Sequence, residues 1–431
     1  MSLVHFDSQK LALCPTYPEE SWRKTNPEIF FLPENEVINF QGNSVVENLK
    51  NHFIPWKVMY RSAALLSDKL KALDSSLGSQ CSEILLSEKN RIVLIEVFHG
   101  YIEVFSSESL LSNIELSSKP YEVESVSPNS EIGFALASRL KASSPHEFCI
   151  YIDNKNNTET PFIIIKNHFT QDFAQSYSAI KLVIAKNSRA DFLLLDAGSN
   201  YIYHRHSIVI NEYGVLNQLW LQQISAEADK SVSLYERLVK LEANAIFKDA
   251  QLFFPKGNTR VTSNIVFAGD RAQAHSGGVV VSAKGKFDYE PIQYHKNAAG
   301  YSALNLKMLL TGRARCIFQG LVKIDKKAEK TKAIQANKNL LLSKLARVDA
   351  APRLEILPND VVCKHGSATG ELDQKQLYYL ATRGLSATEA KKLIIHSFAR
   401  EALNQFSESS SLLNVAESCL EFLLTKSLEK V

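Results

Sequence analysis

A thiol and an imidazole lie two positions apart at Cys363 and His365, in a polar segment that follows a strand-like run. Side chains alternate across an extended strand with a period of two, so these residues should project from the same face. Sulfur and nitrogen are common metal ligands, and the pair could therefore bind a metal ion or cluster. Two ligands do not complete such a site, and a structural thiol beside a hydrogen-bonded histidine is the alternative interpretation.

Two helices are predicted directly after this pair. Asp373 with Gln376, and Ser386 with Glu389, have the capping-box spacing, in which a short polar side chain caps the first turn and the acid or amide three residues later reaches back. The first helix should end at Gly384, because glycine readily adopts the left-handed conformation that terminates helices. The second helix should begin at Ser386.

Three short motifs in this region carry a family resemblance. They are Asn-Asp-Val-Val-Cys-Lys-His-Gly at 359–366, Gly-Glu-Leu-Asp at 370–373 and Leu-Tyr-Tyr-Leu at 377–380. Together they resemble the C-terminal signature of the SufB/SufD family of iron-sulfur cluster assembly proteins. Gly366 stands where B-type members have glutamate and Leu380 where they have cysteine, so the chain looks like a D-type member.

The resemblance implies a fold and a site. The fold of the family is a right-handed parallel β-helix. Its D-type subunit contributes the histidine of the Cys-x-His-Gly motif to the interface with a B-type subunit, where a transient, nascent iron-sulfur cluster forms. This implies a ligand role for His365 and, less firmly, for Cys363. No cofactor is expected to bind tightly to the chain alone.

A second partner is also implied by the resemblance. In the family, a SufC-type ATPase binds the helices that correspond to those after Asp373. Apolar side chains are the usual anchors of helix-mediated interfaces, although about half of those present here could instead pack on the chain's own core. The candidate partner-binding residues are Leu377, Tyr378, Leu380, Leu393, Ile394 and Phe398.

The composition narrows the class of protein. The chain has 431 residues, of which 45% are hydrophobic, enough for a large core and more than one structural unit. A net charge of +3 gives no reason to expect nucleic acid or an anionic membrane as a partner. The six cysteines lack zinc-ribbon or disulfide spacing. Neither a signal-peptide pattern nor an apolar run of about 20 residues is found, so we expect a cytoplasmic protein.

The chain divides into three predicted regions. Residues 1–145 give mixed signals and are interpreted as an α+β region, with a helix expected around residues 132–140. Residues 146–370 are predicted to form the parallel β-helix core. Residues 371–431 are predicted to be a helical segment that binds the ATPase subunit. The fold class is therefore mainly β, with helical elements at both ends of the sequence.

The core region consists of apolar or β-branched runs of strand length. Small residues in polar turns recur about every 24 to 29 residues, with one step of about 42, which favours a solenoid of short strands. A β-sandwich is the competing architecture, but the region has no Asn-Gly or Asp-Gly hairpin turn. The strand runs are Phe162–Ile165, Lys181–Ala185, Phe192–Leu195, Ser207–Ile210, Leu216–Leu221, Ala245–Phe254, Val279–Val281 and Leu321–Ile324.

Two further features of the core are interpreted as structural. His204 and His206 would share a strand face, and we expect a solvent-facing polar and aromatic ladder there, because no third metal ligand lies close by in the sequence. Gly277 and Gly278 are expected to form a tight turn between coils.

No catalytic motif is found in the sequence. The chain lacks a phosphate loop, a nucleophile elbow and a His-Glu-x-x-His helix. This agrees with the family resemblance, which implies a non-enzymatic scaffold subunit that pairs with a B-type subunit and a SufC-type ATPase. One alternative is a carbohydrate-active β-helix enzyme, which needs paired carboxylates on one solenoid face. Another is a B-type or standalone scaffold that forms a homodimer. The sequence does not decide whether the isolated chain is a monomer or a homodimer.

Overall fold

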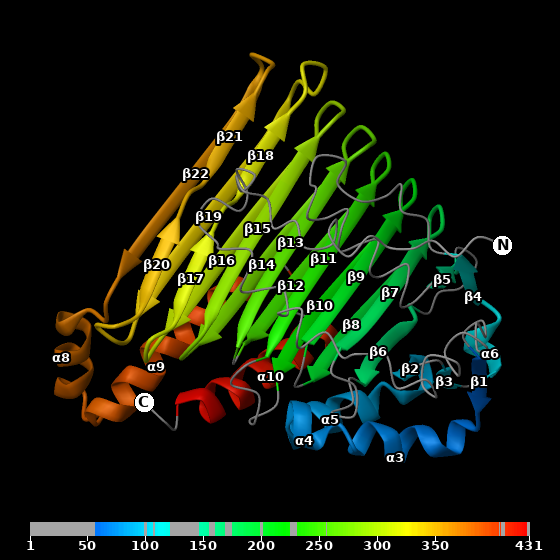
Figure 1. The fold of residues 1–431 in the computed structure, drawn as a ribbon, viewed down its shortest axis with the longest axis horizontal. Coiled ribbons are helices and arrows are strands. Elements are labelled where there is room, and N and C mark those ends of the chain that lie inside the picture. The colour runs from blue at the N-terminus through cyan, green and yellow to red at the C-terminus, as the bar shows by residue number, and fades with distance from the viewer. Residues whose placement is uncertain are drawn as a thin grey trace, which may run out of the picture.

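A computed structural model describes the chain at residues 57–98, 101–106, 108–120, 146–154, 160–168, 175–198, 201–224, 231–255, 257–404, 406 and 410–428. Within these ranges the chain is mainly β, with helices near both ends of the sequence (Figure 1). The helix expected around residues 132–140 lies outside the described residues.

Two 11-stranded sheets form the body of the molecule. Consecutive strands of the chain mostly alternate between the sheets, and each pairs in parallel with the strand one coil earlier. This is the predicted parallel β-helix. Sheet A has the order β1 (Lys57–Arg61), β3 (Tyr101–Phe105), β2 (Ile92–Phe98), β6 (Phe162–His168), β8 (Arg189–Gly198), β10 (Val215–Ile224), β12 (Ile246–Phe254), β14 (Gln273–Ser282), β16 (Tyr301–Leu310), β19 (Thr331–Leu341) and β22 (Val361–Gly370).

Sheet B lies opposite sheet A and ends in two short strands at its C-terminal edge. Its order is β20 (Arg347–Ala350), β17 (Arg315–Phe318), β15 (Lys286–His295), β13 (Asn258–Phe267), β11 (Val232–Leu241), β9 (Tyr201–Ile210), β7 (Gln175–Ile184), β5 (His146–Ile152) and β4 (Ile114–Pro120), with β18 (Leu321–Ile324) and β21 (Arg353–Ile356) beside β15. Among the described strands, antiparallel pairing is confined to β2 with β3 and β4 with β5.

The alternation of side chains along each strand divides the core into two parts. In β8, Phe192 and Leu194 point between the sheets and join the large internal cluster. Leu193 and Leu195 of the same strand point outward and join a second cluster under the helices. Burying each such side chain contributes about 1.5–3 kcal/mol relative to leaving it exposed, so both faces of sheet A stabilise the fold.

A row of turns along one edge of the solenoid shares one backbone conformation. The residues with positive φ in these turns are Asn187, Tyr213, Asn244, Arg271, Ala299 and Lys330. The amide of each donates to a carbonyl oxygen in the turn of the next coil, for example Asn187 to Glu212 at 3.1 Å and Asn244 to Asp270 at 2.9 Å. The coils are thus joined through backbone as well as side chains.

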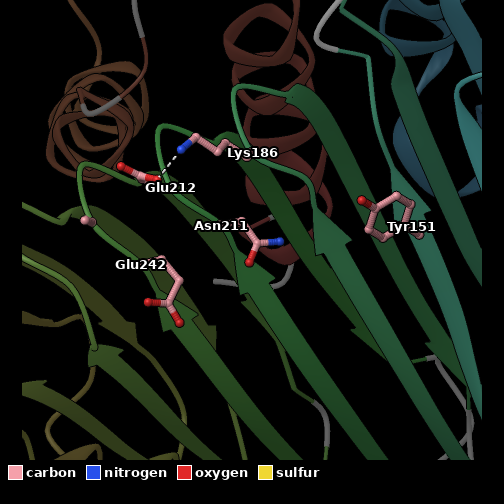
Figure 2. A pocket seen from close by; sticks show the side chains of 6 residues that line it. Tyr151, Lys186, Asn211, Glu212 and Glu242 are labelled. Carbon is pink, nitrogen blue, oxygen red and sulfur yellow. Dashed lines mark hydrogen bonds and ion pairs between the residues drawn. The ribbon is translucent and has the colours of Figure 1, made fainter.

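An open, shallow depression lies over this row of turns (Figure 2). Lys186 and Glu212 form an ion pair of 2.5 Å across it. The residues that line it are Tyr151, Lys186, Asn211, Glu212, Glu242 and Ala243, so none of the predicted site residues belongs to it.

Helices from both ends of the chain cover the outer face of sheet A (Figure 1). The N-terminal group comprises η3 (Ala63–Leu65), α3 (Leu66–Lys71), α4 (Asp74–Leu77), α5 (Ser79–Ser87) and η4 (Lys89–Arg91), and α6 (Glu108–Leu111) packs on β4. The C-terminal group comprises α8 (Gln374–Thr382), α9 (Ala387–Arg400), η6 (Glu401–Leu403) and α10 (Ser411–Leu428). Helix α10 packs on α5 as well as on the sheet.

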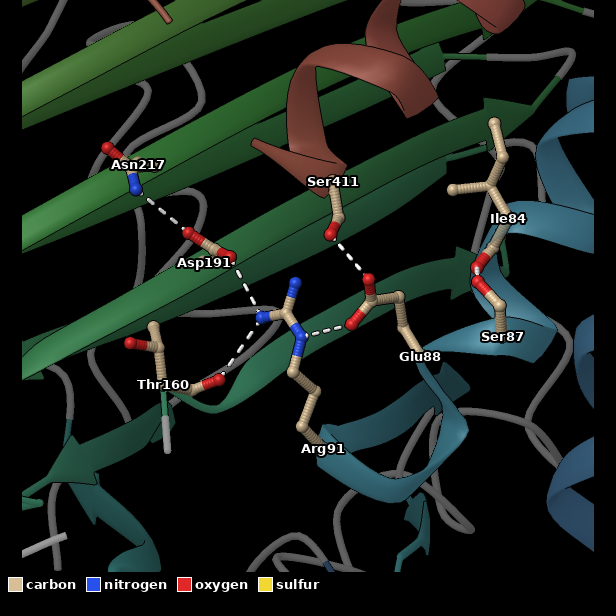
Figure 3. A network of polar contacts seen from close by, with 8 residues as sticks. All are labelled: Ile84, Ser87, Glu88, Arg91, Thr160, Asp191, Asn217 and Ser411. Carbon is tan, nitrogen blue, oxygen red and sulfur yellow. Dashed lines mark hydrogen bonds and ion pairs between the residues drawn. The ribbon is translucent and has the colours of Figure 1, made fainter. Parts of the chain in front are cut away.

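A polar network joins the N-terminal helices, the solenoid and α10 (Figure 3). Arg91 Nη1 donates to Asp191 Oδ2 of β8 at 2.9 Å, and Arg91 Nε donates to Glu88. Ser411, the first residue of α10, donates its hydroxyl to the same Glu88 carboxylate. Asp191 also accepts from Asn217 Nδ2 of β10 at 2.8 Å, so a single arginine joins three parts of the fold.

One sequence expectation about the core is wrong. Gly277 and Gly278 do not form a turn but lie within β14, opposite Ala250 and Gln251 of β12. A Cβ atom at Gly278 would lie 2.8 Å from Leu306 Cδ1 on the neighbouring strand. The glycine therefore makes room for a large side chain in the next coil, which a local sequence pattern does not reveal.

Candidate functional site

Cys363 and His365 lie on β22, the last strand of sheet A. In the parallel register with β19, Cys363 is opposite Ala333 and His365 is opposite Gln335, and both of these partners are buried. Because residues two apart share a strand face, both side chains continue an inward-facing column of the solenoid. The structure places the two residues side by side at its open end.

The two side chains have different surroundings. Cys363 is half-buried and packs against a small apolar cluster that includes Val322, Ile324 and Ala333. Partial burial raises the pKa of the Cys363 thiol, while a hydrogen bond with the Ala333 backbone acts in the opposite direction. His365 is exposed. The imidazole is therefore accessible to a partner or to iron, whereas the thiol is a protonated, weaker ligand at neutral pH.

The pair does not form a complete metal site by itself. In the described parts of the chain, three or more potential ligands converge at one place, Asp196, His204 and His206, and that group does not include Cys363 or His365. A cluster bound at β22 would need its other ligands from another chain.

The strand that carries the pair is an open edge. Among the described strands, β22 pairs with β19 alone. Large apolar side chains are exposed around it: Val362 is 50% exposed, and Ile334, Ile356 and Leu357 are exposed as well. An unpaired edge beside exposed apolar side chains has the features of a docking surface for another strand.

Helices α8 and α9 contain the predicted partner-binding residues. Asp373 caps α8 by accepting from the Lys375 amide at 2.8 Å, and Gly384 follows the helix with a φ of 91°, as predicted. Ser386 and Glu389 form the predicted capping box at the start of α9. The Asp373 cap does not include Gln376, so only the second of the two expected boxes is present.

The six predicted residues divide into exposed and packed ones. Helix α8 has no buried residue, and Tyr378 is 74% exposed. Leu393 of α9 is also exposed, whereas Leu377, Leu380 and Ile394 are half-buried. Phe398 packs on the cluster beneath the helices, and Lys307 Nζ lies 4.5 Å from the centroid of its ring. Phe398 therefore helps to hold α9, while Tyr378 and Leu393 face solvent.

An ionic anchor fixes the end of α9 to sheet A. Glu401 accepts from Lys307 and from Lys338, at 2.5 and 3.2 Å. The hydrogen bond from Lys307 is the main cause of the lowered pKa of Glu401; partial burial acts in the opposite direction, and the hydrogen bond from Lys338 lowers the pKa further. The anchor holds the C-terminal end of α9 on the solenoid, whereas α8 lies beyond the N-terminal end of α9 (Figure 1).

The expectation for His204 and His206 is wrong. Both are buried inside the solenoid and do not face solvent. Asp196, eight positions before His204 in the sequence, lies beside them as a third potential ligand. It comes from β8, the strand before β9, and joins them only because the chain turns back to form the opposite sheet. No spacing pattern between these three residues predicts this grouping.

None of the described helices has the length and apolar character needed to cross a membrane. Residues 162–398, more than half of the chain, match the family described as SUF system FeS cluster assembly, SufBD core domain. The iron-sulfur cluster assembly protein SufD of Escherichia coli (strain K12) is 41% identical over 95 residues, 22% of each chain.

Two other relatives extend the comparison. The iron-sulfur cluster assembly protein SufD of Bacillus subtilis (strain 168) is 36% identical over 119 residues, 28% of this chain and 27% of the relative. A SufBD family protein of Mycobacterium leprae (strain TN) is 25% identical over 238 residues, 53% of this chain and 60% of the relative. The chain thus covers less than two thirds of each relative. The chain belongs to the SufBD family of iron-sulfur cluster assembly proteins and is SufD-like.

Proposed function

We propose that this chain is a cytoplasmic, non-catalytic D-type scaffold subunit, whose solenoid end pairs with a B-type subunit and whose α8–α9 helices bind a SufC-type ATPase. The nascent iron-sulfur cluster is the cargo of this assembly. The observation that carries the proposal is the open β22 edge, which presents an exposed His365 among exposed apolar side chains. Family membership removes the reason to favour a carbohydrate-active enzyme.

The division of labour between His365 and Cys363 follows from their environments. Imidazole is a borderline ligand for iron, and His365 is exposed at the docking edge. Cys363 must lose a proton and leave its apolar contacts before it can bind iron, because burial raises the pKa of its thiol. In this proposal His365 is the ligand from this chain, and Cys363 is a secondary one. The remaining ligands come from the partner, since two cannot complete a cluster site.

The proposed role of the helices rests on their exposure. Helix α8 packs on α9 and buries no residue of its own, although apolar and aromatic residues line it. Anchoring through Glu401 and Phe398 holds the far end of α9 on the solenoid. An ATPase subunit bound at Tyr378 and Leu393 could therefore pull on a helix pair that is fixed at one end. Movement of this helix pair would displace β22, because only a short connection joins β22 to α8.

The cluster role is tested by reconstituting the complex with its B-type and C-type partners under anaerobic conditions. His365→Ala should leave the complex intact but sharply reduce iron and sulfide per complex, with a smaller loss for Cys363→Ser. Lys364→Ala is the matched control, because Lys364 is exposed on the opposite strand face. Normal cluster loading in His365→Ala would refute the ligand role.

The two docking surfaces are tested separately. Val362→Glu should weaken binding of the B-type subunit, whereas Tyr60→Glu, at an exposed position on β1, should not. Leu393→Asp should weaken ATPase binding by at least about tenfold, because a charge at an apolar anchor cannot be desolvated cheaply. Thr388→Asp, which adds the same charge elsewhere on α9, is the control. Phe398→Asp is less informative, because Phe398 also packs on the fold.

A further inference from the structure

A group of potential metal ligands lies deep inside the solenoid, away from β22. Asp196 lies near the end of β8 in sheet A, and His204 and His206 lie on the inner face of β9 in sheet B. Their exposed fractions are 2%, 1% and 4%, so all three are buried. One ligand atom from each lies within 4.8 Å of the others. Side chains from two sheets therefore converge on one point.

The spacing of these atoms suits a small cation. His204 Nδ1 is 3.0 Å from Asp196 Oδ1, and the two imidazole rings are 3.9 Å apart between centroids in an edge-to-face arrangement. Ligands of a tetrahedral zinc ion with bonds near 2.1 Å lie about 3.4 Å apart. An ion could enter this group after small side-chain shifts, without displacing a strand.

His206 provides a second, independent observation. Its Nε2 atom is buried and has no hydrogen-bond partner among the described residues. A buried polar atom without a partner is costly, and metal coordination would satisfy it.

The carboxylate is oriented from two sides. Trp220 Nε1 donates to Asp196 Oδ2 at 2.8 Å, and Asn167 Nδ2 donates to Asp196 Oδ1 at 2.6 Å. Such outer contacts fix the position of a ligand in metal sites. The nearby cation, Arg237, forms an ion pair of 2.8 Å with Asp249, so its charge is balanced. The negative charge of Asp196 remains available to a cation.

We propose that Asp196, His204 and His206 bind one divalent transition-metal ion inside the solenoid. Two imidazoles and one carboxylate form a donor set suited to Fe²⁺, Zn²⁺ and Co²⁺ rather than to Mg²⁺ or Ca²⁺. The site is distinct from the proposed cluster site on β22. Because all three ligands are buried, the ion should exchange slowly and behave as a resident part of the fold.

The test uses tag-free full-length chain carrying His365→Ala and Cys363→Ala, so that metal bound at β22 does not contribute. The protein is produced with Zn²⁺, Fe²⁺ or Co²⁺ supplied in turn, desalted in the presence of a weak chelator, and analysed for metal per chain. We expect about one equivalent, with Co²⁺ giving the visible ligand-field bands of a mixed nitrogen and oxygen site. Which of the three metals is retained identifies the occupant.

Variants show whether the metal is bound by this group. His206→Leu should abolish retention, whereas His275→Leu, at a half-buried histidine on β14, should leave it unchanged. Trp220→Phe keeps an aromatic ring but removes the donor to Asp196, and it should weaken affinity about 10–100-fold. This variant gives an answer even if His206→Leu does not fold.

The proposal is overturned if the parent chain retains none of the three metals, or if His206→Leu or Trp220→Phe retains metal as the parent does. Failure of the cluster role would appear differently, as normal cluster loading in the His365→Ala complex. The two proposals can therefore fail independently.

Discussion

The sulfur atoms of Cys81 and Cys419 lie 3.5 Å apart, fully buried, although 338 positions separate them in the chain. Cys81 belongs to α5 and Cys419 to α10, so this contact marks the interface at which the two ends of the described chain meet. Together with the Arg91 network, it makes the N-terminal and C-terminal helices one layer on sheet A. Damage to one group should therefore affect the other.

We predict that Leu424→Asp loosens both helical groups. Leu424 of α10 is fully buried in the cluster that also contains Leu77, Cys81 and Leu85. A carboxylate there would cost more than about 4 kcal/mol, because it finds no cation in an apolar site. Hydrogen exchange should show faster exchange in 66–87 as well as in 411–428. Glu421→Ala, at an exposed position of the same helix, is the control. Unchanged protection of α3–α5 would contradict the single layer.

The Arg91 network should stabilise the fold far more than an exposed ion pair does. Arg91→Met leaves the Asp191 carboxylate, which is nearly buried, without its cation, and should destabilise the fold by about 2–4 kcal/mol. Arg61→Met breaks the exposed pair with Glu103 and should cost less than about 1 kcal/mol. Chemical denaturation of the two variants checks the ranking. Equal effects would show that burial of the network does not matter.

His295 should make the fold sensitive to acid. Burial lowers the pKa of this residue to about 3, and its ring stacks on Phe267 and bonds to Ser302. The unfolded chain takes up the proton near pH 6.5 and the folded chain does not, so stability from this residue is complete above pH 6.5 and falls as the pH decreases. The loss is about 1.4 kcal/mol per pH unit for one proton.

The His295→Gln variant removes this pH-dependent contribution to the free energy of unfolding. Its denaturation midpoint should fall less steeply than that of the parent chain between about pH 6 and pH 4, although it is lower at neutral pH. Urea titrations at a series of pH values provide the comparison. Parallel pH profiles for the two proteins would rule out a neutral, buried His295.

Two glycines near the candidate site should respond differently to the same substitution. A Cβ atom at Gly320 would lie 2.5 Å from Gln335 Nε2 and 2.6 Å from Phe318 Cζ, so Gly320→Ala must displace packed side chains. We expect a loss of about 1–3 kcal/mol. At Gly366 a Cβ atom meets nothing within 4 Å, and Gly366→Ala should change stability by less than about 1 kcal/mol. Thermal denaturation of both variants distinguishes them, and a destabilised Gly366→Ala would show that the edge is covered in solution.

The sequence predicted those parts of the fold that depend on local chemistry. The Ser386 cap and the Gly384 terminator follow from residues within a few positions of each other. The solenoid was expected from its strand-length runs and recurring turns, and from the family resemblance. Strands such as β13 and β19 are not predicted from the sequence, because polar residues such as Ser263 and Asn337 occupy inward positions that are usually apolar.

Local sequence patterns do not predict which side chains from the two sheets come together. The pattern at His204 and His206 predicts a solvent-facing strand face, because polar strand faces usually contact water. In the structure that face lies inside the solenoid beside Asp196. The role of Gly278 likewise depends on Leu306 in the next coil. Such positions are determined by stacking, which relates residues one coil apart, whereas a sequence pattern relates neighbours along the chain.

The open edge of β22 also has a consequence for the cell. An edge strand with unpaired backbone groups and exposed apolar side chains pairs readily with any similar edge, including that of a second copy. Chain made in excess of the proposed B-type partner would therefore be prone to self-association and aggregation. Balanced synthesis of the subunits would then protect solubility as well as set the yield of complex, and the partner would act as a cap for this end of the solenoid.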